Sequence, residues 1–220
     1  MSLAFEHSRP RECRVIAISR SLAGGGEEVG RIVAKELGFR YADDQIIMMA
    51  ADEAGVSPEL IAGVERTPGL TSRILAAAGR LAGDPEAWSA HTMLSAQTSP
   101  SYEDMIERVI RETSQEGNCV IVAHGASICL AGLSGLLRVL VTASPGARAQ
   151  RLVQETNLSE RQAKRAIRDS DRQRRDYLRR LYNVRQELPT HYDLVLNTDV
   201  LTVPLAAELG LGAARSWRAV

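Results

Sequence analysis

Residues 15–30 read VIAISRSLAGGGEEVG. The first part of this stretch predicts a short apolar strand, its glycines predict a tight turn, and a helix is expected to follow to about Leu37. A turn of this kind directs consecutive backbone N–H groups and a helix N-terminus at one place, which suits a phosphate. A purely structural turn is the alternative. The favoured prediction is a phosphate or nucleotide site that comprises Arg20, Ser21, Gly24, Gly25 and Gly26.

The glycine-rich turn departs from the standard phosphate-binding loop at its charged position. That loop follows the pattern G-x-x-x-x-G-K-[ST]. When Gly26 is taken as its second glycine, Ser21 occupies the first glycine position, and Glu27 and Glu28 occupy the lysine and hydroxyl positions. An acid therefore stands where a cation is expected, and the nearby residues that could compensate for it are Arg20 and Arg31.

The composition indicates a globular protein of one domain, or of one domain with a large insertion. Of the 220 residues, 45% are hydrophobic, 25% are charged, and 27 basic residues balance 27 acidic ones. No apolar run reaches the roughly 20 residues of a membrane span, and the polar N-terminus is unlike a signal peptide. Cys13, Cys119 and Cys129 have neither a C-x-x-C spacing nor an even number. We therefore expect a cytoplasmic protein with reduced thiols.

Apolar runs bounded by turn signals recur along the chain. They predict strands at 14–18, 39–42, 119–123, 136–142 and 193–197. The third and fourth runs are continuously apolar, as in strands that are buried on both faces. Helical patterns separate the strands and include one that opens at Asp43-Asp44 and a C-terminal one around Pro204–Leu209. Strands that alternate with helices predict an α/β fold with a parallel sheet.

The stretch from about 45 to 115 has the pattern of a helical insertion. Ser57-Pro58 is a good pair for the start of a helix, and Ser101 and Asp104 have the spacing of a capping box. The segment 70–81 is rich in alanine and amphipathic. Its apolar face is compatible with a homodimer interface and equally with core packing.

A long basic helix is predicted between the last two strands. From Arg138 to Arg185 the chain has twelve arginines and one lysine against five acids. Six arginines recur at intervals of three and four, which places them on one face: Arg161, Arg165, Arg168, Arg172, Arg175 and Arg179. Guanidinium groups suit phosphate oxygens. Contact with substrate phosphates is therefore the favoured interpretation, and a solvated face or a nucleic-acid or partner surface are the alternatives.

Two polar residues follow predicted strands and are expected to lie in the same crevice. Ligands in open α/β sheets bind beyond the carboxyl ends of the strands, where the sequence places Asp43 and His124. Asp43 is a candidate for contact with an acceptor substrate or with a metal-bound water, against a role as a helix N-cap. His124 is a candidate phosphate donor or acid–base group, against a structural role.

In their order and spacing these segments resemble the cytidylate kinase-like family, a branch of the P-loop nucleoside monophosphate kinases. The resemblance runs over nearly the whole chain. It rests on Ile18-Ser19-Arg20 before the glycines, Glu28-Val29-Gly30 after them, Leu37-Gly38-Phe39 before Asp43, Val120-Ile121-Val122 before Gly125-Ala126, DRQRRDY at 171–177 and YDLVLNT at 192–198.

The resemblance implies a three-layer, P-loop kinase-like α/β fold in a single domain, with a five-stranded parallel sheet. The core would comprise 13–44 and 117–220, with a helical acceptor-binding insertion at about 45–115 and an arginine-rich lid at about 155–185. The implied activity transfers the γ-phosphoryl group of ATP, with Mg²⁺, to a nucleoside monophosphate, with CMP or dCMP favoured. Gly24, Gly25 and Gly26 would cradle donor phosphates, Asp43 would lie at the acceptor pocket, and the catalytic phosphate clamps would be Arg172, Arg174 and Arg175.

Two departures from the family pattern leave the activity open. The family usually has a basic residue in place of Glu27 and a Gly-Arg pair in place of Ala123-His124. Either the lid arginines supply the missing charge, or the chain is a non-catalytic nucleotide-binding sensor or regulatory module. No set of metal-ligating residues is visible, since Mg²⁺ would be held mainly by phosphates and water. A net charge of zero and only 4% aromatic residues argue against nucleic-acid binding, so a small-molecule nucleotide is the expected partner.

Overall fold

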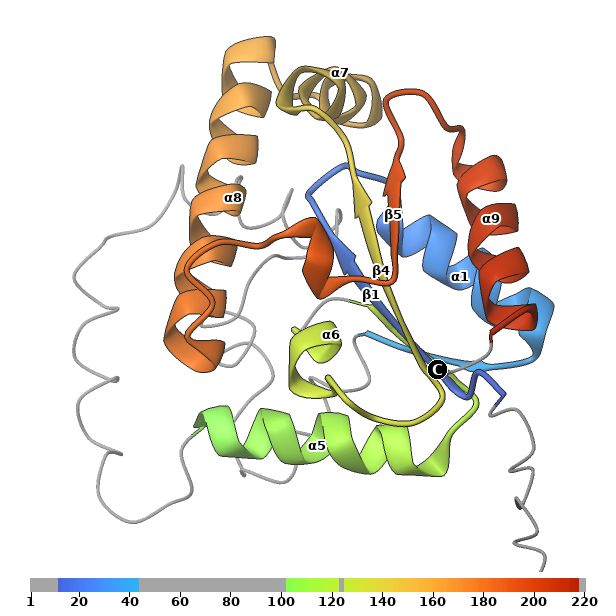
Figure 1. The fold of residues 1–220 in the computed structure, drawn as a ribbon. Coiled ribbons are helices and arrows are strands. Elements are labelled where there is room, and N and C mark those ends of the chain that lie inside the picture. The colour runs from blue at the N-terminus through green and yellow to red at the C-terminus, as the bar shows by residue number, and fades with distance from the viewer. Residues whose placement is uncertain (1–11, 44–101, 123–124, 218–220) are drawn as a thin grey trace, which may run out of the picture.

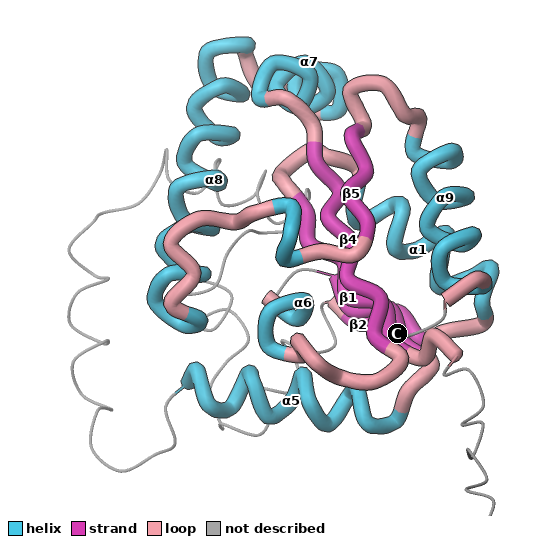
Figure 2. Tube along the Cα trace, in the orientation of Figure 1, coloured by secondary structure: helices cyan, strands magenta, loops and turns pink. Residues whose placement is uncertain are grey.

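The structure, a computed structural model, describes residues 12–43, 102–122 and 125–217. Its strands are β1 (Val15–Arg20), β2 (Arg40–Ala42), β3 (Cys119–Val122), β4 (Leu136–Thr142) and β5 (Leu194–Asn197). Its helices are α1 (Gly26–Leu37), α5 (Tyr102–Glu116), α6 (Ala126–Cys129), α7 (Pro145–Glu155), α8 (Glu160–Tyr182), the short 3₁₀ helix η2 (Pro189–His191) and α9 (Val203–Arg215). Figure 1 shows their arrangement in space, and Figure 2 distinguishes helices, strands and loops.

The five strands form one parallel sheet in the order β2-β3-β1-β4-β5. β1 occupies the centre, where Val15 pairs with Cys119 on one side and with Leu136 on the other. The order changes direction at β1, because β3 and β4 lie on opposite sides of it. In open α/β sheets, ligands bind beyond the carboxyl ends of the strands at such a position. The α/β class and the five-stranded parallel sheet are confirmed.

Alternating side chains of β1 divide the core into two layers. Ile16 and Ile18 lie in the cluster that α1 and α9 cover, whereas Val15 and Ala17 lie in the cluster on the opposite face, with α5 and α6. Successive residues of a strand point to opposite faces, so Ser19 and Arg20, which continue β1, also point to opposite faces. The side chains of Ser19 and Arg20 therefore lie on different sides of the sheet.

The local sequence explains where α1 begins and ends. Gly25 is the N-cap with φ of 80°, and Gly38 is the C-cap with φ of 66°, both in the left-handed region that favours glycine. Between them, Val29, Val33 and Ala34 are buried at helical spacing against the sheet. The predicted helix end at about Leu37 is confirmed.

Two helices connect β4 to β5, one more than the sequence analysis predicts. α7 begins after Ser144, whose hydroxyl accepts a hydrogen bond from the Ala147 N–H group at 3.3 Å, and has Pro145 in its first turn. This Ser-Pro pair was the available signal. α8 is the predicted basic helix, and its buried face includes Ala163, Ile167, Ser170 and Leu178.

The other boundaries differ from the predictions in limited ways. β1 extends two residues further than expected, to Arg20, and α9 continues to Arg215. α5 corresponds to the helix expected to begin near Ser101, and it buries Val109 and Ile110. The helix expected at Asp43-Asp44, most of the insertion and the alanine-rich segment 70–81 lie outside the described residues.

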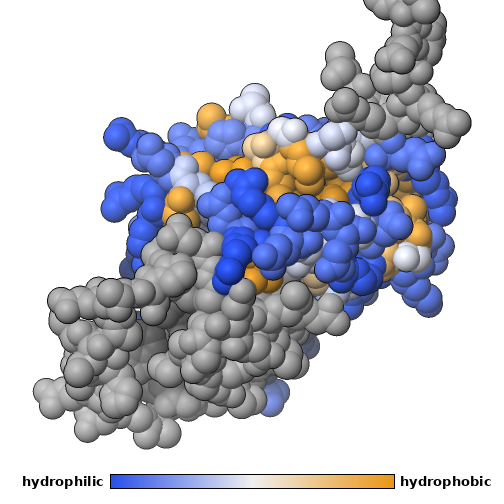
Figure 3. Space-filling view, turned by 90° about the horizontal axis from the view of Figure 1, so that it is seen from below, coloured by the Kyte–Doolittle hydropathy of each residue, from blue (hydrophilic) through white to orange (hydrophobic). Residues whose placement is uncertain are grey.

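Among the described residues, six large apolar side chains are exposed: Leu133, Leu188, Val195, Val200, Leu205 and Leu209. Seen from below, the described surface is mostly hydrophilic, with hydrophobic residues between the polar ones (Figure 3). Among the residues described, no helix combines the length and apolar character needed to cross a bilayer. The three cysteines are free thiols, and burial raises the pKa of each to about 11. They are therefore protonated, weakly nucleophilic groups at neutral pH.

Candidate functional site at the glycine turn

The glycine turn, residues 21–25, links the centre of the sheet to the start of α1. The Ser21 N–H group donates to the Val141 carbonyl of β4 at 3.3 Å, and the Gly24 N–H group donates back to the Ser21 carbonyl at 2.9 Å. No side chain caps the first N–H groups of α1. Uncapped N–H groups at a helix N-terminus, together with the helix dipole, form a site for an anion.

Gly26 makes room for the arginine that precedes the turn. A Cβ atom on Gly26 would lie 2.5 Å from the Cβ and 3.4 Å from the Cδ of Arg20. The Arg20 side chain therefore packs directly against the backbone of the turn and is only 3% exposed. Its Nε and Nη1 atoms are buried and have no hydrogen-bond partner. Buried donors without an acceptor are costly, and a bound anion would satisfy them.

Glu27 pairs with Arg20 across the start of α1. The Nη2 atom of Arg20 lies 2.5 Å from Oε1 of Glu27 and 4.0 Å from Oδ2 of Asp43. Arg31, the other cation considered as compensation, instead lies over the ring of Tyr41 at 5.3 Å. The unexpected acid of the turn is thus balanced by Arg20, which brings Glu27 and Asp43 within reach of one guanidinium group.

The turn is fastened from the other edge of the sheet. Thr198, which follows β5, donates from its buried hydroxyl to the Gly24 carbonyl at 2.9 Å. Arg151 of α7 donates from Nη1 to the Thr198 hydroxyl at 2.9 Å and to the Ala23 carbonyl at 3.3 Å. Sequence reasoning missed both residues, because nothing in the local pattern links segments that are so far apart.

A second charged cluster lies on the opposite face of β1. Arg174 of α8 is 9% exposed, and its Nε and Nη2 atoms donate to the two carboxylate oxygens of Glu187 at 3.0 and 2.7 Å. Nη2 also donates to the Ser19 hydroxyl. The Tyr192 hydroxyl lies 2.9 Å from the Ser19 hydroxyl and donates to Glu187. We call these four residues the Ser19 cluster.

The pKa values of the Ser19 cluster follow from burial and mutual pairing. Burial alone would raise the pKa of Glu187, but hydrogen bonds and charge from Arg174, with hydrogen bonds from Tyr192 and Ser19, lower it overall. Burial alone would lower the pKa of Arg174, but Glu187 raises it. Burial, and then the Glu187 carboxylate, raise the pKa of Tyr192 to about 12. Near neutral pH the cluster is therefore an ion pair with a neutral phenol.

The structure separates the three predicted clamp arginines. Arg174 lies next to β1, whereas Arg172 is 65% exposed and pairs with Asp169 at 2.9 Å. Arg175 is exposed as well. All six arginines of the predicted stripe are exposed, and Asp169 pairs with two of them, Arg165 and Arg172. The inner face of α8 thus places one guanidinium, that of Arg174, at the end of β1. His124 lies outside the described residues.

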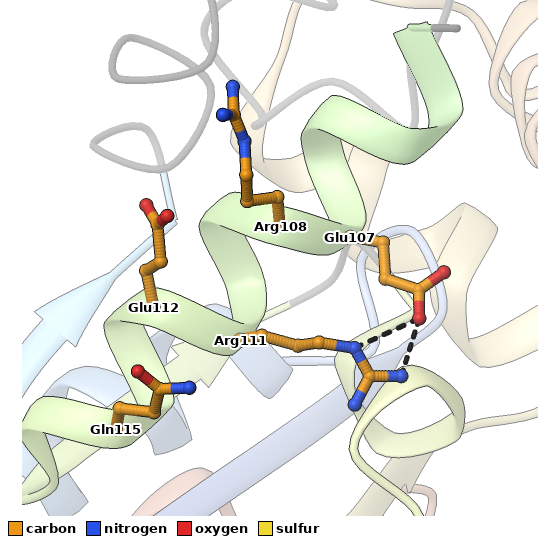
Figure 4. Close-up of a pocket in the computed structure, with 5 residues that line it drawn as sticks. All are labelled: Glu107, Arg108, Arg111, Glu112 and Gln115. Carbon is orange, nitrogen blue, oxygen red and sulfur yellow. Dashed lines mark hydrogen bonds and ion pairs between the residues drawn. The ribbon is translucent and has the colours of Figure 1, made fainter. Parts of the chain in front are cut away.

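A surface hollow of about 540 Å³ lies elsewhere, along α5 (Figure 4). It is lined by Glu107, Arg108, Arg111, Glu112 and Gln115, and Arg111 Nε donates to Glu107 at 3.0 Å. None of the predicted site residues lines it. Among the described residues, no group of three or more His, Cys, Asp or Glu side chains is placed to hold a metal ion.

Comparison with known proteins places this site in a family context. The sequence profile described as the cytidylate kinase-like family matches residues 15–200. No curated protein matches the sequence. Among solved structures, an uncharacterized protein from Eubacterium ventriosum has a TM-score of 0.65 and 13% identity, covering 93% of this chain and 99% of that chain. This likeness shows a shared fold.

Two shikimate kinases are more distant in structure. The enzyme from Bacteroides thetaiotaomicron has a TM-score of 0.49 and 12% identity, covering 90% of this chain and 94% of its own. The enzyme from Acinetobacter baumannii, solved in complex with shikimate, has a TM-score of 0.47 and 13% identity, covering 90% of each chain.

Proposed function

This chain belongs to the cytidylate kinase-like family, and we propose that it transfers the γ-phosphoryl group of ATP to a nucleoside monophosphate. The family match supports a kinase-like phosphotransferase in general. The preference for CMP or dCMP as acceptor is the finer part of the proposal and rests on the resemblance to that family. We propose the cytoplasm, where nucleotide pools are found, as the place of action.

The observation that carries the proposal is the cradle formed by the glycine turn and Arg20. The turn presents the uncapped N-terminus of α1, and the buried Nε and Nη1 atoms of Arg20 lack acceptors. Phosphate oxygens are strong acceptors for both kinds of donor. Ser21, Gly24, Gly25 and Gly26 are accordingly proposed to line the donor-phosphate site, with Arg20 as its nearest fixed cation.

The residues present fit a nucleoside triphosphate with its magnesium ion. The turn supplies backbone donors for phosphate oxygens, while Mg²⁺ is typically held by substrate phosphates, water and one or two carboxylates. Glu27 and Asp43 both lie near Arg20 Nη2, so carboxylate oxygens are at hand. Bound Mg²⁺ would supply neutralisation of phosphate charge. Within the protein, Arg20 and the start of α1 would hold the phosphates.

The lid arginines are proposed to differ in role. Arg174 already donates to the Ser19 hydroxyl of β1. Because Ser19 lies shortly before the glycine turn, Arg174 is proposed as the first of the three to contact a bound phosphate. Arg172 and Arg175 lie on the solvent side of α8 and would act on phosphates after a movement of the helix. Asp43, buried after β2, and His124 are proposed to contact the acceptor.

A coupled phosphotransfer assay tests the proposal. Purified full-length protein is supplied with Mg-ATP and a panel of ribo- and deoxyribonucleoside monophosphates. Turnover is expected, highest with CMP or dCMP. Arg174→Ala is expected to reduce kcat by roughly 10³-fold, since an arginine that stabilises the transferring phosphoryl group can contribute about that factor to the rate. Arg174→Lys keeps the positive charge and should reduce kcat by a smaller factor.

The matched control is Lys164→Ala, on the same helix but outside the arginine stripe. The Lys164 side chain is 53% exposed and pairs with Glu160 one turn away, so its removal should leave kcat within about twofold. Thermal unfolding of each variant confirms that the protein is folded. If folded wild-type protein neither binds ATP nor any monophosphate at millimolar concentration, the proposed function is wrong.

A second candidate function is a non-catalytic nucleotide-binding module. The observation in its favour is the pairing of Arg20 with Glu27, since it cancels positive charge where a phosphoryl group would be transferred. This candidate predicts measurable affinity for nucleotides without turnover across the whole acceptor panel. The same assay, combined with titration calorimetry, therefore separates the two functions.

A further inference from the structure

The carboxylate of Glu187 is the centre of the Ser19 cluster. It accepts hydrogen bonds from the Ser19 hydroxyl at 3.0 Å, from Nε and Nη2 of Arg174 at 3.0 and 2.7 Å, and from the Tyr192 hydroxyl. These donors come from β1, from α8 and from the residue that follows η2. One side chain in the loop after α8 thus fixes an arginine of the lid helix against the central strand.

A comparison with Arg148 shows what is unusual about Arg174. Both are buried arginines that form a two-point ion pair with a carboxylate. All three nitrogens of Arg148 are used, because Nη1 and Nη2 donate to Asp171 at 2.8 and 2.7 Å and Nε donates to the Ala143 carbonyl at 3.0 Å. Arg148 joins α7 to α8 with all three guanidinium nitrogens hydrogen-bonded, which is a structural role.

In Arg174, by contrast, one guanidinium nitrogen makes no hydrogen bond to a described residue. Its Nε and Nη2 atoms are used by Glu187 and Ser19. Among the described residues, Nη1 has no hydrogen-bond partner. It is not fully buried, so part of its surface is open to solvent. Since Ser19 directly precedes Arg20 and the glycine turn, this free amino group lies close to the end of β1.

We propose that Glu187 is a positioning residue that holds Arg174 so that Nη1 is presented to the transferring phosphoryl group. The inference rests on the proposed phosphotransfer function. Glu187 neutralises the charge of Arg174, so the contribution of the arginine is a well-placed hydrogen-bond donor more than net positive charge. The orientation of the guanidinium plane is fixed by two bonds to the carboxylate, and Tyr192 and Ser19 fix the carboxylate in turn.

Glu187→Gln is the substitution that tests this role. The amide keeps the size of the side chain but replaces one carboxylate oxygen with an NH₂ group, which is a donor. The Gln side chain can therefore no longer offer one oxygen to Nε and a second to Nη2 of Arg174. The guanidinium should then lose its fixed orientation. We expect kcat to fall roughly 10- to 100-fold with a smaller change in KM for ATP, since a displacement of about 1 Å can cost about 100-fold in rate. Tyr192→Phe should give an intermediate loss.

Asp171→Asn is the matched control. Asp171 lies on α8, as Arg174 does, and the substitution weakens its ion pair with Arg148 of α7. It should lower the unfolding temperature at least as much as Glu187→Gln and leave kcat within about twofold. This comparison separates loss of stability from loss of positioning. The measurements are steady-state kcat and KM with Mg-ATP and the best acceptor, Mg-ATP affinity by titration calorimetry, and thermal unfolding of each full-length variant.

Two results in the variants would overturn the inference while leaving the proposed function intact. One is a kcat for folded Glu187→Gln within about twofold of the wild type. The other is tighter Mg-ATP binding in Glu187→Gln, because it would mean that Glu187 masks Arg174 from phosphate. Wild-type protein without nucleotide binding or turnover would instead contradict the proposed function, and this inference with it.

Discussion

At the scale of single residues, Arg20 and Gly26 show how one position depends on the next. Arg20 continues a buried strand and would have no space for its side chain if residue 26 carried a Cβ atom. Glu27 then balances the buried guanidinium. A change at Gly26, Arg20 or Glu27 therefore affects the other two residues. Each substitution is best compared with a control at a position that has no such contacts.

The first prediction concerns Gly26→Ala. The new methyl group would lie 2.5 Å from Arg20 Cβ, so Arg20 or the turn must move. We expect a loss of roughly 1–3 kcal/mol in the free energy of unfolding and weaker Mg-ATP binding. Gly212→Ala is the control, because a Cβ at this position of α9 meets nothing within 4 Å. It should stabilise the protein by about 0.5–1 kcal/mol, as measured by denaturant unfolding.

The second prediction concerns Glu27. Glu27→Gln leaves the 3%-exposed Arg20 side chain with Asp43 at 4.0 Å as its nearest carboxylate. We expect a loss of about 1–3 kcal/mol in the free energy of unfolding. Glu27→Lys, which restores a basic residue at this position, should be less stable still because it places two cations together. A Glu27→Lys protein more stable than Glu27→Gln would show that the ion pair does not contribute to stability.

At the scale of elements, distant segments fix the glycine turn and the lid helix. Thr198 after β5 and Arg151 of α7 hold the turn, while ion pairs of Arg148 and Arg174 hold the middle of α8. The contacts to the turn, and the one from Arg174 to Ser19, join elements that are far apart in sequence. The site therefore depends on the docking of α7, α8 and the end of β5 as much as on the glycines.

The third prediction follows from the contact between β5 and the turn. Thr198→Val keeps the shape of the side chain but removes the donor to the Gly24 carbonyl. A buried acceptor without a partner costs about 1–3 kcal/mol, so stability should fall by that amount. Nucleotide affinity should fall as well, because Gly24 belongs to the cradle. Titration calorimetry and denaturant unfolding check both effects; unchanged affinity would show that the turn holds its shape without Thr198.

The fourth prediction concerns the pH dependence of the Ser19 cluster. The pKa of Glu187 is lower in the folded protein than in the unfolded chain, chiefly because Arg174 outweighs the effect of burial. Its contribution to stability is therefore fully present above the unfolded pKa of about 4.5 and is lost as the pH falls through the folded pKa.

Denaturant unfolding of the wild type and of Glu187→Gln between about pH 7 and pH 3 measures this contribution. The difference in unfolding free energy should be constant down to about pH 5 and shrink below it. A difference that stays constant over the whole range would show that the carboxylate charge of Glu187 does not stabilise the fold.

The sequence predicted the elements better than it predicted the contacts. Continuous apolar runs marked β3 and β4, and glycines marked both ends of α1, because these signals are local. The partners of Arg20 and Arg174 were not predictable. Glu187 lies in an irregular loop, and a periodic arrangement on α8 drew attention to its exposed arginines, while Arg174 falls outside that stripe. Which arginine faces the site depends on how α8 docks, and docking is a tertiary property.

At the scale of the whole molecule, a single parallel sheet brings two charged clusters to opposite sides of one strand end. Arg20 faces α1 and β2 with Glu27 and Asp43, and Ser19 faces α8 with Arg174 and Glu187. Under the proposed function, a phosphate at the turn would have one guanidinium on each face of the sheet, Arg20 on one side and Arg174 on the other. The alternation of side chains along β1, which the sequence does show, is the physical reason for this arrangement.

The central place of β1 also has a consequence for how the chain is made. β1 is synthesised well before its hydrogen-bonding partners, which begin at Cys119 and Leu136. The nascent chain must therefore carry an unpaired apolar strand until these two partner strands have been synthesised. Long-range parallel pairing of this kind folds slowly and is prone to aggregation. We expect ribosome-bound chains that end before Cys119 to be protease-sensitive and to bind chaperones, and protection to appear only after β4 has emerged.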